Sequence, residues 1–241
     1  MIDVGLIVAG LIAGLINAMA GGGSTITLPL LLLFGVDAAV ANGTNRVAVL
    51  FQSLSASRSF AAHGAVDWRI TWRLLPLVLG GALVGAVAAT HISPANLETI
   101  FGVMFIVLGL VFSVQSKLKL SDRFSGMLRF RWVFLIVLGF YGGLLQAGVG
   151  IPLLMTLLGC YGLSFGAANA TKAIHISIYS LAVLFIFGSA DQVHFRYGIE
   201  LACGGVVGSH FGAKIAMRHQ PRWLTPVLSL FLVVMGLRTL L

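Results

Sequence analysis

Ten apolar stretches follow one another along the chain, separated by short polar segments. Most are about 16–20 residues long, which lets a helix cross the roughly 30 Å of hydrocarbon in a bilayer. The second stretch in each half has only about 13 residues and suits a half-helix or a re-entrant segment. We therefore expect an all-α polytopic membrane protein with about eight full transmembrane helices plus short broken or re-entrant segments. The ten stretches are 4–20, 24–36, 43–62, 74–91, 96–115, 132–147, 151–163, 170–189, 199–217 and 223–241.

The composition supports the same class. Hydrophobic residues make up 59% of the chain and charged residues only 9%, whereas soluble domains carry about 25% charged residues. The net charge of +8 resides in the segments between apolar stretches, which is typical of cytoplasmic loops rather than of a nucleic-acid surface. The expected partners are therefore the lipid bilayer and a small solute, and no nucleic acid.

An internal repeat divides the chain. When the sequence is shifted by 127 residues, 24 of 93 aligned pairs between residues 18–110 and 145–237 are identical. Such duplication is a hallmark of transporters. The predicted organisation is a first transmembrane repeat (1–115), a basic cytoplasmic connection (116–131) and a second repeat (132–241). The first apolar stretch has a counterpart at 132–147 and lacks a preceding Lys or Arg, so we expect it to belong to the fold rather than to a signal peptide.

Loop charges predict the orientation of each repeat. Residues 58–73 and 116–131 are basic, which predicts that both are cytoplasmic with 91–98 outside. In the second half the bias reverses, because 191–200 is weakly acidic and 214–222 is basic. Equivalent loops thus carry opposite charge, which favours an inverted repeat with both termini outside.

Glycine-rich breaks separate the first two stretches of each half. Three successive glycines at 21–23 do not favour a regular helix, since each costs about 1 kcal/mol relative to Ala. Unwound backbone at membrane depth must be buried or line a wet cavity, and the N–H groups that start the next helix can bind an anion. The alternative, close packing through small residues, is preferred for the Gly81/Gly85 and Gly208/Gly212 pairs. The predicted binding residues of the two breaks are Gly21, Gly22, Gly23, Ser24, Gln146, Gly148 and Gly150.

Polar residues interrupt the third stretch of each half near its start. A buried cation is expensive in lipid and tends to mark a substrate pathway, and an anionic substrate is the natural counter-ion for Arg46 and Lys172. The alternative is that both side chains extend to the lipid headgroups. The predicted contacts are Asn42, Thr44, Asn45, Arg46, Asn169, Thr171 and Lys172.

Further along these stretches, His175 is either a proton carrier or a hydrogen-bonded packing residue, and it is included among the candidate substrate-binding residues. Gln52 and Tyr179 occupy aligned positions of the repeat and could line a polar path. Cys160 and Cys203 lack metal-ligand spacing and are interpreted as core residues. No hydrolase, nucleotide-binding or metal-binding motif is present in the sequence, so we expect no enzyme activity, no catalytic residues, no metal and no cofactor.

The motifs together resemble the sulfite exporter TauE/SafE family over nearly the whole chain. They are a Gly-rich run at 20–23, a Pro-Leu run at 29–32, and the polar segments 41–46 and 64–69. The second half fits through 146–150 and 168–172. The resemblance implies a bacterial inner-membrane carrier for small organosulfur or related anions. Val149 departs from the family's glycine run, which bears on the substrate or leaves one half mainly structural.

The predicted function is a secondary transporter, working as an exporter, of a small anion such as sulfite or an organosulfonate by alternating access. An anion channel and a non-transport membrane scaffold are the alternatives. The expected location is the cell inner membrane, as a multi-pass protein. The sequence leaves open the substrate, direction, coupling ion and any homo-oligomer.

Overall fold

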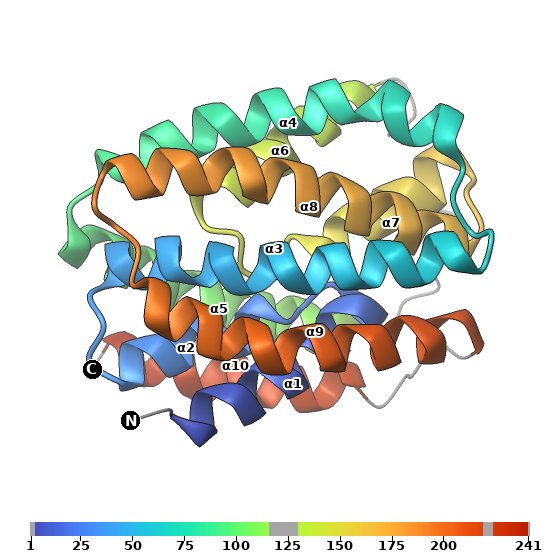
Figure 1. Cartoon of the computed structure of the whole chain (residues 1–241). Helices are drawn as coiled ribbons and strands as arrows, with labels where there is room; N and C mark the ends of the chain where they lie inside the picture. Colours follow the sequence, from blue (N-terminus) through green and yellow to red (C-terminus); the bar gives the residue numbers. More distant parts are fainter. Residues whose placement is uncertain (1–2, 116–129, 219–223, 241) are drawn as a thin grey trace.

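The computed structural model describes residues 3–115, 130–218 and 224–240, and within these residues the chain forms ten helices (Figure 1). The all-α prediction is confirmed for the described residues. The helices are α1 (Val4–Ala20), α2 (Ser24–Leu33), α3 (Ala38–Ala62), α4 (Trp68–Thr90), α5 (Pro94–Gln115), α6 (Arg131–Leu144), α7 (Gly150–Tyr161), α8 (Phe165–Ser189), α9 (Phe195–Arg218) and α10 (Leu224–Leu240).

Three helices begin about five residues before the apolar stretches that predicted them. The side chains of Asp37, Asp67 and Ser164 accept hydrogen bonds from backbone N–H groups in the first turns of α3, α4 and α8. Such caps satisfy donors that have no partner inside the helix. As a result, the polar segments 42–46 and 169–172 lie inside helices rather than at their first residues.

The helices pack in equivalent pairs. α1 packs against α9 and α4 packs against α6, while α3 contacts α8 and α5 contacts α10. By the internal repeat, α6 is the counterpart of α1 and α9 is the counterpart of α4, so both halves use the same packing. In Figure 1, α3 and α8 lie side by side at the centre, and their sequence colours run in opposite directions. α3 and α8, which correspond in the internal repeat, are therefore antiparallel.

Glycines bring the paired helices close together. A Cβ added to Gly85 of α4 would lie 2.0 Å from the Phe140 carbonyl oxygen of α6. One added to Gly208 of α9 would lie 1.9 Å from the Leu11 carbonyl oxygen of α1. No side chain fits at these distances, so the packing interpretation of the Gly-x-x-x-Gly pairs is confirmed.

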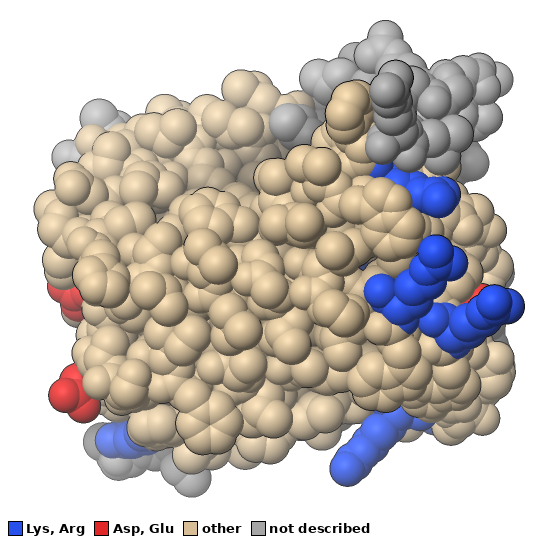
Figure 2. All heavy atoms as spheres, turned by 90° about the horizontal axis from the view of Figure 1, so that it is seen from above, with Lys and Arg blue, Asp and Glu red and all other residues tan. Residues whose placement is uncertain are grey.

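Charged side chains gather at the two ends of the molecule. Figure 2 shows most of the visible Lys and Arg at one end, most of the visible acidic surface at the other, and a predominantly uncharged surface between them. The exposed residues Arg58 and Arg69 lie near the turn that joins α3 to α4. The last turns of α9, which carry Lys214, are at the same end of the molecule. Glu98 and Asp191 lie near the turns at the opposite end. The basic segment 58–73 therefore lies at the same end as Lys214, and the segments 91–98 and 191–200 lie together at the opposite end.

Two of the described helices, α4 and α8, are long and apolar enough to cross a membrane by length and composition alone. This is fewer than the eight expected full crossings. Polar and charged residues interrupt α3, whose apolar pattern is weaker for that reason. The helices α1, α2, α6, α7 and α10 have fewer than 18 residues. The short lengths of α2 and α7 agree with the prediction of half-helices.

The basic connection predicted at 116–131 lies outside the described residues except for its last two positions. Cys160 is buried, as predicted, but Cys203 is exposed on α9. The interpretation of Cys203 as a core residue is therefore wrong. It falls on the outward side of α9, whereas Leu201 and Ala202 face the interior.

Candidate functional site

Each half contains a helix break followed by a half-length helix. Gly21 ends α1 with a φ of 84° and Gly148 follows α6 with a φ of 69°, values that favour glycine because it has no Cβ. The helices that follow, α2 and α7, have 10 and 12 residues, or about 15 and 18 Å at 1.5 Å per residue. Each is about half the thickness of the hydrocarbon core.

The two breaks meet. A Cβ added to Gly21 would lie 2.5 Å from the Gly150 Cα, and one added to Gly150 would lie 2.4 Å from the Gly21 Cα. The structure therefore brings the N-terminal regions of α2 and α7 together from opposite halves of the chain. Within the described residues, the backbone N–H groups of Gly22, Gly23 and Gly148 donate no hydrogen bond. This contact forms the centre of the candidate site.

Arg46 lies on α3 and is fully buried. Its Nη1 donates a hydrogen bond to the Gly142 carbonyl, and its Nη2 donates to the Gly143 carbonyl at 2.8 Å and to the Asn42 Oδ1 at 3.0 Å. The Asn42 Nδ2 in turn donates to the Leu144 carbonyl at 2.7 Å. Arg46 of the first half thus binds the C-terminal end of α6 in the second half.

Lys172 repeats this arrangement with the halves exchanged. It lies on α8, is 1% exposed, and donates to the Asn169 Oδ1 at 2.6 Å and to the Asn17 carbonyl at 3.3 Å. Asn17 is in the last turn of α1. The C-terminal end of a helix carries a partial negative charge of roughly half an elementary charge, so each cation is stabilised by the first helix of the opposite half.

Neither cation has a carboxylate partner among the residues that the structure describes. The salt bridge found within these residues joins two other side chains, Arg196 and Glu200, at 3.2 Å. Helix-end carbonyls compensate only part of each charge, and a buried charge without a counter-ion is costly. Both side chains are buried, so the alternative in which they extend to headgroups is not what the structure shows.

The remaining predicted residues fall into two groups. The Thr44 hydroxyl accepts from the His194 backbone N–H at 2.8 Å, and Thr171 shares a hydrogen bond with Thr71 at 2.9 Å. The His175 Nε2 lies 2.8 Å from the Thr71 carbonyl. Thr171 and His175 thus contact α4, and Thr44 contacts the residue that precedes α9.

Asn45 and Ser24 lie closer to the first break. The Asn45 Oδ1 accepts from the Thr27 hydroxyl at 2.5 Å, which joins α3 to the half-helix α2. Ser24 is buried at the start of α2. The Gln146 Nε2 donates to the Ser180 hydroxyl at 3.3 Å, next to the second break.

Sequence reasoning did not select four residues that complete these clusters. Gly142 and Gly143 act through backbone carbonyls, which leave no signal in the sequence. Asn17 donates through its side chain to the Gln52 Oε1 at 3.2 Å; a polar residue four positions before a glycine run in an apolar stretch was the available signal. Tyr179 is fully buried beside Gly142, and its alignment with Gln52 had indicated a polar path.

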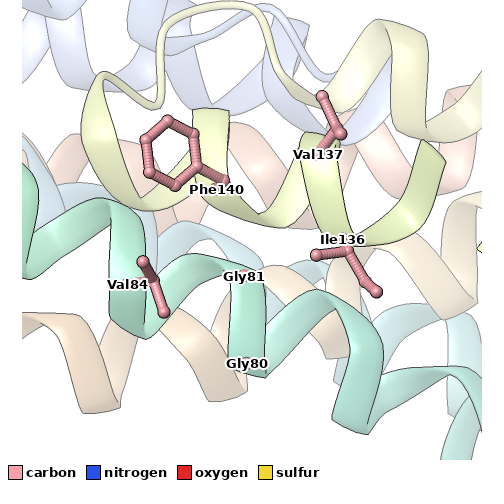
Figure 3. Close-up of a pocket in the computed structure, with 6 residues that line it drawn as sticks. All are labelled: Gly80, Gly81, Val84, Ile136, Val137 and Phe140. Carbon is pink, nitrogen blue, oxygen red and sulfur yellow. The ribbon is translucent and has the colours of Figure 1, made fainter. Parts of the chain in front are cut away.

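A separate apolar groove of about 350 Å³ lies between α4 and α6 (Figure 3). It is lined by Gly80, Gly81, Val84, Ile136, Val137 and Phe140. None of the candidate site residues lines this groove, so it is distinct from the site at the breaks.

The model of the family described as sulfite exporter TauE/SafE matches residues 6–239. A "Probable membrane transporter protein" of Haemophilus influenzae is 31% identical over 92% of this chain and 88% of its own length. "Probable membrane transporter protein ORF9" of a Sinorhizobium species is 28% identical (98% and 91%), and YfcA of Escherichia coli, which has the same descriptive name, is 24% identical (95% and 86%). No solved structure matches the chain. The resemblance noted in the sequence is thus confirmed, and the chain belongs to the sulfite exporter TauE/SafE family of membrane transporters.

Proposed function

We propose that this chain is a secondary transporter, working as an exporter, that moves a small anion such as sulfite or an organosulfonate across the bacterial inner membrane by alternating access. The observation that carries the proposal is the burial of Arg46 and Lys172 without a carboxylate partner in the described part of the chain. An anion that reaches these side chains supplies the missing counter-charge.

The contact between the two breaks supports a substrate site at this place. The N-terminal ends of α2 and α7 converge where Gly21 meets Gly150, and helix N-termini carry partial positive charge and free N–H donors. Discontinuous helices that aim their N-termini at an anionic group are a recurrent design of transporters. The site therefore has backbone donors at its centre and one cation cluster from each half.

The antiparallel directions of α3 and α8 support an inverted repeat. The separation of charges then supports an orientation: the end with Arg58, Arg69 and Lys214 faces the cytoplasm, and the chain termini lie outside. In such a protein, rocking of one half against the other opens the central site to each side in turn.

The direct test is flux of radiolabelled sulfite or a sulfonate into proteoliposomes that contain the purified chain. A carrier gives saturable uptake and counterflow, in which unlabelled anion inside accelerates entry of labelled anion. Flux without counterflow supports an anion channel, and absence of any anion flux supports a scaffold. Arg46→Ala and Lys172→Ala should each abolish the flux, whereas the exposed control Lys214→Ala should retain it.

A further inference from the structure

The groove between α4 and α6 is a hollow in the outward surface of the molecule (Figure 3). Gly81 and Gly85 draw the two helices together, whereas Gly80 has no atom within 4 Å of an added Cβ. On the two walls, Val84 is 63% exposed and Val137 is 53% exposed, so the groove opens away from the protein interior. Its volume of about 350 Å³ lies within the range of ligand pockets, about 300–1,000 Å³.

The walls of the groove are apolar. They consist of two glycines, three aliphatic side chains and one phenylalanine. An anion placed there would lose its hydration without gaining a side-chain hydrogen-bond donor, which is costly. Figure 2 views the molecule from the side of α4 and shows a predominantly uncharged surface. A hydrocarbon chain is therefore the occupant that these walls suit.

The two helices that form the walls run in the same direction. Along α4, Gly81 meets the Ile136 carbonyl of α6, and one turn later Gly85 meets the Phe140 carbonyl. The first residues of both helices therefore lie at the same end of the groove. This is the basic end of the molecule, because α4 begins beside the exposed Arg69.

Two arginines lie close to one tryptophan ring at this end. The guanidinium carbon of Arg73 is 5.5 Å from the centroid of the Trp132 ring, and that of Arg131 is 5.3 Å from it. Within the part of the chain that the structure describes, neither arginine forms an ion pair. Guanidinium groups suit phosphate oxygens, which they can bind through two parallel hydrogen bonds. The pair of arginines is therefore available to a phosphate group.

The arginines and the groove are aligned along α4. Gly80 and Val84 follow Arg73 by 7 and 11 residues, about two and three helical turns, so the three positions share one face. The distance from Arg73 to Gly80 along the axis is about 10 Å at 1.5 Å per residue. Nearby, Trp68 and Trp72 stack with ring centroids 6.4 Å apart, and both are more than half exposed. Tryptophan favours the level of the lipid headgroups, so the groove begins at the level of the acyl chains.

We propose that an anionic phospholipid binds along α4 and α6, with its phosphate at Arg73 and Arg131 and one acyl chain in the groove. The apolar walls select the chain, and the two cations select a headgroup with net negative charge. Basic pockets between membrane helices are suited to such headgroups. The proposed ligand is a lipid, so the inference is independent of the solute that the chain transports.

The test is native mass spectrometry of the purified full chain in detergent, titrated with phosphatidylglycerol and, separately, with phosphatidylcholine of the same acyl chains. The wild type should bind one phosphatidylglycerol more tightly than phosphatidylcholine. The double variant Arg73→Gln, Arg131→Gln should raise the dissociation constant of phosphatidylglycerol about 30-fold, the combined effect of two cations at a lipid headgroup. The control is Arg58→Gln, Arg69→Gln, which removes the same charge from exposed positions at the same end and should keep the wild-type value.

A second variant tests the groove itself. Gly80→Leu fills it from a position with open space, and should raise the dissociation constant at least about 10-fold, because the acyl chain loses the burial of several methylene groups. Gly188→Leu is the matched control, because Gly188 is another helical glycine with no atom within 4 Å of an added Cβ. It should bind like the wild type.

Three results would overturn the proposal. The first is equal affinity of the wild type for the two lipids. The second is wild-type affinity for phosphatidylglycerol in the arginine double variant or in Gly80→Leu. The third is a wild-type dimer that Gly80→Leu dissociates, since a second copy of the chain would then occupy the groove. None of these results would bear on anion flux, so the proposed transport function is tested separately.

Discussion

Gly21 and Gly150 touch through their backbones, with the Cα of Gly150 only 2.5 Å from the position that a Cβ on Gly21 would occupy. The two glycines come from opposite halves of the chain, and each lies beside the start of a half-length helix. Any movement of one half relative to the other must alter this contact. The pair is therefore both a close backbone contact between the halves and the centre of the proposed site.

Replacement of Gly21 by Ala should destabilise the protein more than the same change at Gly35. Both glycines have positive φ, but only Gly21 has backbone atoms within reach of an added Cβ. Left-handed strain costs about 1–2 kcal/mol, and overpacking adds about 1–3 kcal/mol at Gly21 alone. The measurement is the melting temperature in detergent. Equal losses in Gly21→Ala and Gly35→Ala would show that the contact is not tight.

Asn42→Ala should lower the free energy of unfolding by about 3 kcal/mol, because two buried partners lose their hydrogen bonds. These are the Leu144 carbonyl and the Nη2 of Arg46. Asn96→Ala is the control, since Asn96 is exposed at the start of α5. Denaturant or thermal unfolding of both variants checks the difference. A loss below about 0.5 kcal/mol for Asn42→Ala, within the range of ordinary surface substitutions, would contradict the assigned bonding.

Helix number and approximate position could be predicted from hydrophobicity, because each apolar stretch corresponds to one helix. The starts of α3, α4 and α8 could not, since hydrophobicity alone does not register the N-caps Asp37, Asp67 and Ser164. Those caps extend the helices through polar residues. Cap residues followed by an apolar run are a readable signal, and they would have corrected the boundaries.

The candidate site was predicted only in part for a similar reason. Repeat alignment singled out the glycine breaks and the two cations, because unusual residues recur there at equivalent positions. It could not show that Arg46 binds carbonyls of the opposite half, since the partners at Gly142 and Gly143 are backbone atoms. Contacts of Thr44, Thr171 and His175 with neighbouring helices depend on which helices pack together, and that is a property of the fold.

Close packing between α4 and α6 yields a prediction with an adjacent control. Gly81→Ala places a Cβ 2.2 Å from the Ile136 carbonyl oxygen, whereas Gly80 has no atom within 4 Å of an added Cβ. Gly81→Ala should therefore reduce stability by about 1–3 kcal/mol. Gly80→Ala should be neutral or slightly stabilising, since Ala favours a helix over Gly by about 1 kcal/mol. The measurement is the melting temperature of each variant. A lower melting temperature for Gly80→Ala than for Gly81→Ala would contradict the close packing of α4 against α6.

The proposed inverted repeat can be tested at two equivalent positions. Arg69 and Arg196 are 127 residues apart and aligned in the repeat, and both are exposed. In a variant with Cys160→Ala and Cys203→Ala, a single cysteine at each position is treated with a membrane-impermeant maleimide in intact cells. Arg196→Cys should react and Arg69→Cys should be protected until the cells are lysed. Reaction of both, or of neither, would indicate a parallel repeat.

The central claim, that Arg46 and Lys172 are the counter-charges of an anionic substrate, is tested most directly by thermal shift of the purified chain with a panel of anions. A ligand at 100 times its dissociation constant stabilises the folded state by about 2.7 kcal/mol. The account predicts that sulfite or a sulfonate raises the melting temperature of the wild type, and that Lys172→Ala and Arg46→Ala lose this rise. No rise with any anion, or an equal rise in both variants, would contradict it.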